Sequence, residues 1–169
     1  MRISTSSDRR GFSSARNFAF FALAMVLLIV PVPESVLLFR PDFVALLLIY
    51  LCWHDSKKTG VFTAFVVGLL VDALTFGFLG LHALAKVVVA YCAIRLNRFA
   101  SGSSPLISAL LVLSILLCQS IVIGLVSLYT ENGTVSLALW VSPIVGAVLW
   151  LIIAFVSTTV KPIRNVPIK

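Results

Sequence analysis

The chain has 169 residues, of which 60% are hydrophobic and only 11% are charged, and its formal net charge is +7. Soluble domains carry about 45–50% apolar and about 25% charged residues, so these proportions exclude an ordinary water-soluble fold, and they also exclude a disordered chain. One small core could not hide this much apolar surface from water. The composition predicts a single compact membrane domain, and the excess positive charge must then be assigned to one side of the bilayer.

Six apolar segments are long enough, at about 20 residues, to be read as spanning helices. They lie at about 15–33, 36–54, 59–78, 80–97, 105–129 and 135–160. Residues 1–14 are then a mobile basic N-terminal segment, and residues 161–169 are a basic tail. At the fifth segment, Ser104 and Pro105 are predicted to be the N-cap and the first helical residue.

The positive charges predict the orientation of these segments. If the N-terminus is cytoplasmic and all six segments cross, eleven of the thirteen Lys and Arg residues lie on the cytoplasmic side. Arg40 is then the one cation outside, and Lys86 lies within a helix. If segment 36–54 did not cross, only four cations would be inside and eight outside, against the positive-inside rule. The charges therefore favour six spans with both termini in the cytoplasm.

The second segment is the weakest span. Its uninterrupted apolar run, Phe43–Trp53, would form a helix of roughly 16 Å, about half the thickness of the hydrocarbon layer. Arg40, Pro41 and Asp42 interrupt the chain directly before it, so we expect a break near the outer interface, with Pro41 opening the helix. Such a break is tolerated only where protein or a water-filled cavity covers the backbone.

Four polar side chains are predicted to share one level in the outer half of the bilayer: Asp72, Lys86, Gln119 and Ser142. In an antiparallel hairpin that turns near Leu79, Asp72 and Lys86 both lie roughly 10 Å inside the interface, so an ion pair between them is feasible. Charged groups within a span are costly and need a reason. The simplest reason is structural: Asp72 and Lys86 neutralise each other and fix how the helices are aligned. An ion pathway, a small-ligand pocket and a site for a partner helix remain alternatives.

Small residues recur every four positions in two segments, as Gly60, Ala64, Gly68 and Asp72 in the third and as Thr134, Ala138, Ser142 and Gly146 in the sixth. Small residues at this spacing let helix backbones approach each other within lipid. The stripe that contains Asp72 is therefore predicted to face a neighbouring helix.

Cysteine and histidine residues form no recognisable chemical set. Cys52, Cys92 and Cys118 all fall within predicted spans, which favours small buried side chains over a disulfide framework. His54 and His82 are predicted at opposite membrane faces, so they cannot share a metal ion. We expect no catalytic residue, metal or cofactor, and no nucleic-acid partner, because the positive charge already serves orientation.

Two motifs stand out in the first half of the chain. An Arg-Pro-Asp motif, Arg40 to Asp42, precedes the second span, and a G-x-x-x-D motif, Gly68 to Asp72, is followed by a Leu-Gly-x-x-Ala-Leu turn that includes Gly80. Both motifs resemble those of the rod shape-determining protein MreD family. The resemblance implies structural and partner-site roles, with no catalysis, for the matching positions Arg40, Pro41, Asp42, Gly68, Asp72 and Gly80. His82 stands where the family often has Asn.

The resemblance implies an all-α integral membrane protein of the bacterial cytoplasmic (inner) membrane, with six transmembrane helices and a fold similar to the substrate-binding subunits of energy-coupling-factor transporters. It also implies a non-enzymatic scaffold subunit of the cell-elongation complex. This subunit lies in contact with the lipid bilayer and helps to organise peptidoglycan synthesis. Such a subunit binds an MreC-like protein and, through it, the RodA glycosyltransferase, a penicillin-binding transpeptidase and the filament protein MreB. The alternative, drawn from the likeness of fold alone, is a vitamin-binding transporter subunit.

Overall fold

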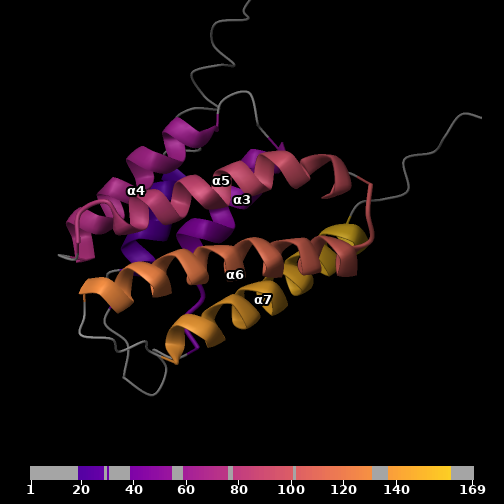
Figure 1. Cartoon of the computed structure of the whole chain (residues 1–169). Coiled ribbons are helices and arrows are strands. Elements are labelled where there is room, and N and C mark those ends of the chain that lie inside the picture. The colour runs from indigo at the N-terminus through magenta and orange to yellow at the C-terminus, as the bar shows by residue number, and fades with distance from the viewer. Residues whose placement is uncertain are drawn as a thin grey trace, which may run out of the picture.

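The computed structural model describes residues 19–28, 30, 39–54, 59–75, 78–100, 102–130 and 137–160. Across these ranges the regular secondary structure is entirely α-helical, with no strand. The helices are an N-terminal helix Ala19–Leu28, α3 (Phe43–His54), α4 (Val61–Thr75), α5 (Leu81–Ala100), α6 (Pro105–Thr130) and α7 (Ala138–Val160) (Figure 1). The expected all-α class is therefore what the described part of the chain adopts.

Helix α5 occupies the middle of the bundle. It packs against α3, α4 and α6, and α6 in turn packs against α7. In Figure 1, α4 and α5 form one side of the molecule and α6 and α7 the other; α5 packs directly against α6, and α3 lies mainly against α5. This arrangement brings residues from α3, α5 and α6 to one interior surface.

Helix α3 supplies much of the core. Its sequence, FVALLLIYLCWH, is apolar on all sides, which is typical of a helix surrounded by protein or lipid. Its buried side chains are Val44, Ala45, Leu46, Leu48, Ile49, Leu51 and Cys52. With 12 residues it is roughly 18 Å long, well short of the hydrocarbon thickness. A short central helix places its own N-terminus inside the bundle.

The starts of α3 and α6 test two of the predicted helix boundaries. Ser104 and Pro105 are confirmed as the N-cap and first residue of α6, since the Ser104 hydroxyl accepts the Ile107 N–H at 3.4 Å. At α3 the prediction was wrong by two residues. The helix begins at Phe43, because Asp42, not Pro41, provides the side-chain oxygen that caps the first free N–H groups.

Helix length separates the elements into two groups. The apolar stretches Pro105–Tyr129 and Ala138–Val156 are each long and apolar enough to cross a membrane. The apolar helices Ala19–Leu28, Phe43–His54 and Val61–Thr75 are shorter. Thr134, which belongs to the predicted stripe of small residues in the sixth segment, lies outside the described residues.

The turn from α4 to α5 depends on Gly80, which has a φ of +104°. Side chains other than glycine are strained in this region, but a Cβ atom at Gly80 would meet no atom within 4 Å. Gly80→Ala is therefore expected to lower the free energy of unfolding by about 1–2 kcal/mol through backbone strain alone. Thermal unfolding in detergent measures the loss, and Gly80→Asn should lose less, because Asn tolerates positive φ better. Equal losses for the two variants would contradict this explanation.

Candidate functional site

A cluster of polar side chains joins α3, α5 and α6 inside the bundle. The Lys86 ammonium group pairs with Oδ2 of Asp42 and also donates to Oε1 of Gln119 at 3.3 Å. The Gln119 amide Nε2 donates to the same Asp42 Oδ2 at 2.8 Å. Each member of this triangle comes from a different helix, so the contacts tie the three helices together at one level.

Burial makes this triangle energetically important. Lys86 is 1% exposed and Gln119 is 5% exposed, whereas the Asp42 side chain retains 21% exposure. A charge inside a low-dielectric interior is costly unless it is paired and hydrogen-bonded. Asp42 and Gln119 meet this requirement for Lys86, so these three side chains form a neutral group whose ammonium charge is paired and hydrogen-bonded.

The feasible ion pair between Asp72 and Lys86 is not the one that forms. The structure pairs Lys86 with Asp42, a residue that the sequence placed in a motif near the membrane surface. The physical reason is the short α3, whose N-cap lies at the depth that the Lys86 ammonium group reaches. A long flexible lysine stem can extend its charge along the helix toward such a partner.

Asp72 instead binds the N-terminus of α5. Its carboxylate accepts backbone N–H groups from Gly80 at 2.8 Å, His82 at 2.9 Å and Ala83 at 3.2 Å. Nδ1 of the His82 ring also lies 2.9 Å from Oδ1 of Asp72. The first N–H groups of a helix have no partner within the helix, and negative charge is favoured there. Asp72, which is 1% exposed, therefore caps α5 from α4 and holds the hairpin closed.

The substitution Asp72→Asn is expected to lower the free energy of unfolding by about 2–3 kcal/mol, because hydrogen bonds to a charged acceptor are strong and the amide group replaces one accepting oxygen with a donor. That donor would face a backbone N–H with no acceptor to bind. The midpoint of thermal unfolding in detergent is the measurement. Thr75→Val, which removes a neighbouring hydroxyl that bonds only within α4, is the matched control. If Asp72→Asn is as stable as the control variant, the capping role is wrong.

An open cavity of about 250 Å³ lies beside these groups. Its lining includes Arg40, Asp42, His82, Gln119, Ser120 and Ser142. Ser142 therefore lies at the same cavity as Asp42 and Gln119, while Asp72 reaches it only through His82. The guanidinium group of Arg40 donates to the backbone carbonyl of Leu27, near the end of the N-terminal helix. Every element from the N-terminal helix to α7 thus contributes to, or is tied to, this site.

The stripe of small residues on α4 lies at the contact with α5. A Cβ atom at Gly68 would lie 2.4 Å from the Cα atom of Ala83, so only glycine permits this approach. Ala64 is 0% exposed, whereas a Cβ atom at Gly60 would meet nothing within 4 Å. On α7, a Cβ atom at Gly146 would lie 2.8 Å from Cδ1 of Leu116. Gly68 therefore sets the distance between α4 and α5, whereas the Gly146 contact is with the flexible end of a leucine side chain, which can move.

Cys92 of α5 and Cys118 of α6 lie beside each other, whereas the two histidines lie far apart. All three cysteines are free, but Cys118 is exposed, so the prediction of a buried side chain is wrong for that residue. His54 is the last residue of α3, and His82 lies in the first turn of α5. Both helices begin near the Asp42–Lys86 pair, so the two histidines lie at opposite ends of the helices. Within the part of the chain that the structure describes, no group of three His, Cys, Asp or Glu residues could hold a metal ion.

The outside of the bundle is as apolar as its inside. Large exposed hydrophobic side chains occur on every described helix, among them Phe20, Tyr50, Phe62, Tyr91, Leu110 and Phe155. Contiguous apolar surface on this scale is rare in monomeric soluble proteins and suits contact with lipid. A bundle that buries the charges of Asp72 and Lys86 and exposes large apolar side chains is suited to a bilayer.

Comparison with known proteins gives the family. The chain matches the family model of rod shape-determining protein MreD over residues 12–158, which includes the polar cluster and both of its motifs. No solved structure matches the chain. The match covers most of the sequence, and the apolar helices agree with a membrane protein, so the chain belongs to the MreD family of membrane proteins, which determine the shape of rod-shaped cells.

Proposed function

We propose that this chain is a non-enzymatic scaffold subunit of the bacterial cell-elongation complex, which crosses the inner membrane six times and binds an MreC-like protein. The observation that carries the proposal is the family match over residues 12–158, since this family acts in rod-shape determination. Through the MreC-like protein it would be linked to RodA, a penicillin-binding transpeptidase and MreB.

The chemistry of the polar cluster supports a scaffold. Both oxygens of Asp72 accept backbone N–H groups, and Oδ2 of Asp42 accepts from Lys86 and Gln119. Carboxylates that are held in this way position helices and do not activate a nucleophile. A rigid bundle with an open polar cavity at one end can present a defined surface to a partner helix.

We place the contact with the MreC-like protein at the cavity beside the cluster. Arg40 and Asp42 of the first motif line this cavity, together with Gln119 and Ser142. These groups offer hydrogen-bond donors and acceptors where the surrounding surface is apolar, and polar groups contribute to helix association within lipid. The cavity is lined by motif residues and is open to the outside of the bundle, so a partner helix can reach it.

The partner contact is tested by filling the cavity. Ser142→Phe should reduce recovery of an MreC-like protein by co-purification at least tenfold, and cells that depend on the variant should lose their rod shape. Ile144→Phe adds the same ring to the same helix at an exposed apolar position, and it should change neither result. Normal recovery with Ser142→Phe would remove the cavity from the interface, whereas normal rods after depletion of the whole protein would overturn the proposed function itself.

The topology is tested separately with fusions. Alkaline phosphatase is active only outside the cytoplasm, so a phosphatase fused after residue 169 should be inactive, and a green fluorescent fusion at the same place should fluoresce. Eleven cations on one side predict this result under the positive-inside rule. Phosphatase activity at the C-terminus would contradict the six-span topology.

A further inference from the structure

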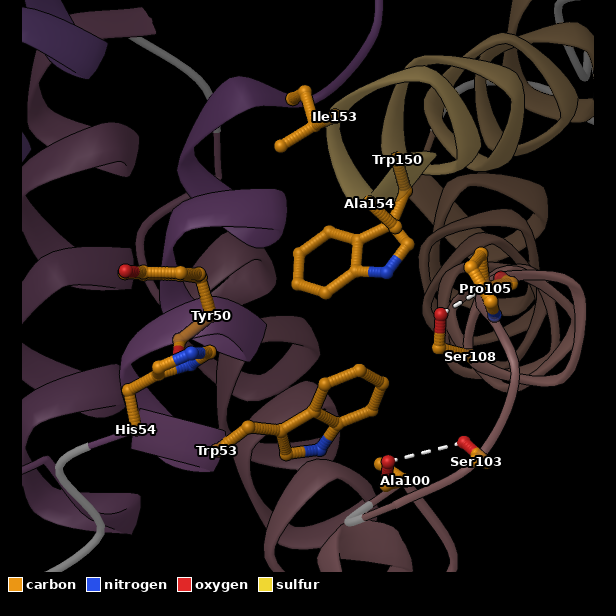
Figure 2. Close-up of a pocket in the computed structure, with 10 residues that line it drawn as sticks. All are labelled: Tyr50, Trp53, His54, Ala100, Ser103, Pro105, Ser108, Trp150, Ile153 and Ala154. Atoms are coloured by element: carbon orange, nitrogen blue, oxygen red, sulfur yellow. Dashed lines mark hydrogen bonds between the residues drawn. The ribbon is translucent and has the colours of Figure 1, made fainter. Parts of the chain in front are cut away.

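A second cavity lies at the other end of the helices from the polar cluster. It has a volume of about 380 Å³, within the roughly 300–1,000 Å³ typical of small-molecule sites. We call it the aromatic pocket, and its lining is Tyr50, Trp53 and His54 of α3, Ala100, Ser103, Pro105 and Ser108 around the α5–α6 turn, and Trp150, Ile153 and Ala154 of α7 (Figure 2).

The aromatic walls are held in place by their own contacts. The rings of Trp53 and Trp150 meet edge to face, with centroids 5.2 Å apart and planes at 89°. The Trp53 indole N–H donates to the Ala93 carbonyl oxygen at 3.0 Å, and the Tyr50 and His54 rings stack at 4.2 Å. These side chains therefore keep the pocket preformed.

Trp150 carries an unused hydrogen-bond donor at this pocket. The residue is 9% exposed, and its indole Nε1 is a buried side-chain nitrogen with no hydrogen-bond partner in the part of the chain that the structure describes. In Figure 2 this nitrogen faces the side of the pocket that Pro105 and Ser108 form. An unsatisfied buried donor is costly and uncommon, so an acceptor supplied from outside the chain would remove a real penalty.

The pocket changes in polarity from one side to the other. The hydroxyls of Ser103 and Ser108 lie on the side of the α5–α6 turn, where they donate to the carbonyl oxygens of Ala100 and Pro105. Tyr50 and Ile153, which are 42% and about 50% exposed, line the apolar side and leave it open toward the surrounding lipid. An occupant would need a polar acceptor at one end and an apolar body at the other.

The charged side chains at this end of the helices determine whether a positive or a negative headgroup is favoured in the pocket. Arg95 and Arg98 are exposed on the last turns of α5, which ends at the pocket residue Ala100. Among the described residues the acids are Asp42 and Asp72, which lie at the opposite end of the helices, Asp42 paired with Lys86 and Asp72 bound to the start of α5. Neither arginine lines the pocket, and their guanidinium groups lie over the rings of Tyr91 and Phe99, but their positive charge at this end of α5 favours an anionic headgroup.

We propose that the aromatic pocket binds one anionic phospholipid from the leaflet on its side of the membrane. Trp150 Nε1 would donate to a phosphate or ester oxygen of the lipid, and the Trp53 and Trp150 rings would contact its glycerol and first methylene groups. Arginines on α5 would attract the headgroup, as basic pockets between membrane helices do for anionic lipids. Tryptophan suits this depth because its ring is apolar and its N–H is polar.

The test uses the intrinsic fluorescence of the two pocket tryptophans. The third tryptophan, Trp140, is at the start of α7, so the Trp140→Phe variant leaves only Trp53 and Trp150 as reporters. This variant is placed in nanodiscs of phosphatidylethanolamine with increasing fractions of brominated phosphatidylglycerol or brominated phosphatidylethanolamine. Half-maximal quenching is expected at a mole fraction at least fivefold lower for the glycerol lipid. Equal quenching by both lipids, as ordinary surrounding lipid would give, overturns the proposal.

Two variants tie the effect to the pocket. Trp150→Phe keeps a ring and removes the N–H, so the fivefold preference should fall below twofold, with Trp53 as the reporter. Ala154→Phe fills the pocket and should do the same, while Val148→Phe at an exposed position of α7 should not. A preference that survives both pocket variants would place the lipid elsewhere and overturn the proposal.

Stability provides a readout that does not depend on fluorescence. Added phosphatidylglycerol should raise the unfolding midpoint of the wild-type protein in detergent by several degrees but leave Trp150→Phe unchanged, although the two proteins should have similar midpoints without lipid. Native mass spectrometry should then detect one phospholipid on the wild-type protein. A retained polypeptide in place of a phospholipid would identify a different occupant and overturn the proposal.

Discussion

Replacing Asp42 with Asn is expected to lower the free energy of unfolding by about 3 kcal/mol. Removing one partner of a buried ion pair costs about 3–5 kcal/mol, because it leaves the other charge without compensation, and Lys86 is only 1% exposed. The lower end of this range applies because the Asp42 side chain is 21% exposed. Asn also caps helices well, so the variant removes the charge and keeps the N-cap of α3.

The companion variants separate charge from packing. Lys86→Met alone should cost less than Asp42→Asn, because the remaining carboxylate keeps some solvent contact and the Gln119 N–H. The double variant Asp42→Asn, Lys86→Met should recover at least half of the loss, since no buried charge remains. Reversible denaturation in SDS with mixed micelles gives the free energies. A double variant no more stable than Asp42→Asn would show that the pairing does not determine stability at this site.

Gly68→Ala is expected to be among the most damaging single substitutions in α4. The added Cβ atom would lie 2.4 Å from the Cα atom of Ala83 and 2.7 Å from the carbonyl oxygen of His82. Both are backbone atoms, so no flexible side chain can move aside, and α4 and α5 must separate. Overpacking typically costs about 1–3 kcal/mol and sometimes more, and the upper part of that range applies here. The same separation would lengthen the bonds from Asp72 to the start of α5.

The matched control for this prediction lies on the same stripe of the sequence. A Cβ atom at Gly60 would meet nothing within 4 Å, so Gly60→Ala should leave the unfolding midpoint within about a degree of the wild type. Thermal unfolding in detergent and the amount of folded protein in the membrane measure both variants. Similar values for Gly68→Ala and Gly60→Ala would mean that the close approach of α4 and α5 is not required for folding.

Local patterns were enough to predict the helical class, the start of α6 and the close contact made by α4. Long apolar runs identified a membrane protein built of helices, and Ser104-Pro105 marked the start of α6 correctly. The glycine of the third segment predicted a close contact of helices, and Gly68 lies at such a contact. These features depend on neighbouring residues in the chain, so hydropathy, caps and four-residue spacing report them directly.

The partners of the buried charges could not be predicted in the same way. Counting residues from the turns put Asp72 and Lys86 at one depth, but depth does not decide which direction a side chain takes. Asp72 turns toward the free N–H groups of α5, and Lys86 reaches a carboxylate 44 positions earlier in the sequence. His82 contributes a ring nitrogen to Asp72 that no pattern indicated.

The sequence by itself determined that this is a helical membrane protein of the MreD family and which residues carry its motifs. Only the tertiary structure decided that Asp42 neutralises Lys86, that Asp72 caps α5, and that Trp150 holds an unused donor in an aromatic pocket. The reason is physical. Hydropathy and capping are local properties of the chain, whereas the choice of a partner depends on how helices distant in sequence are shifted and rotated against one another.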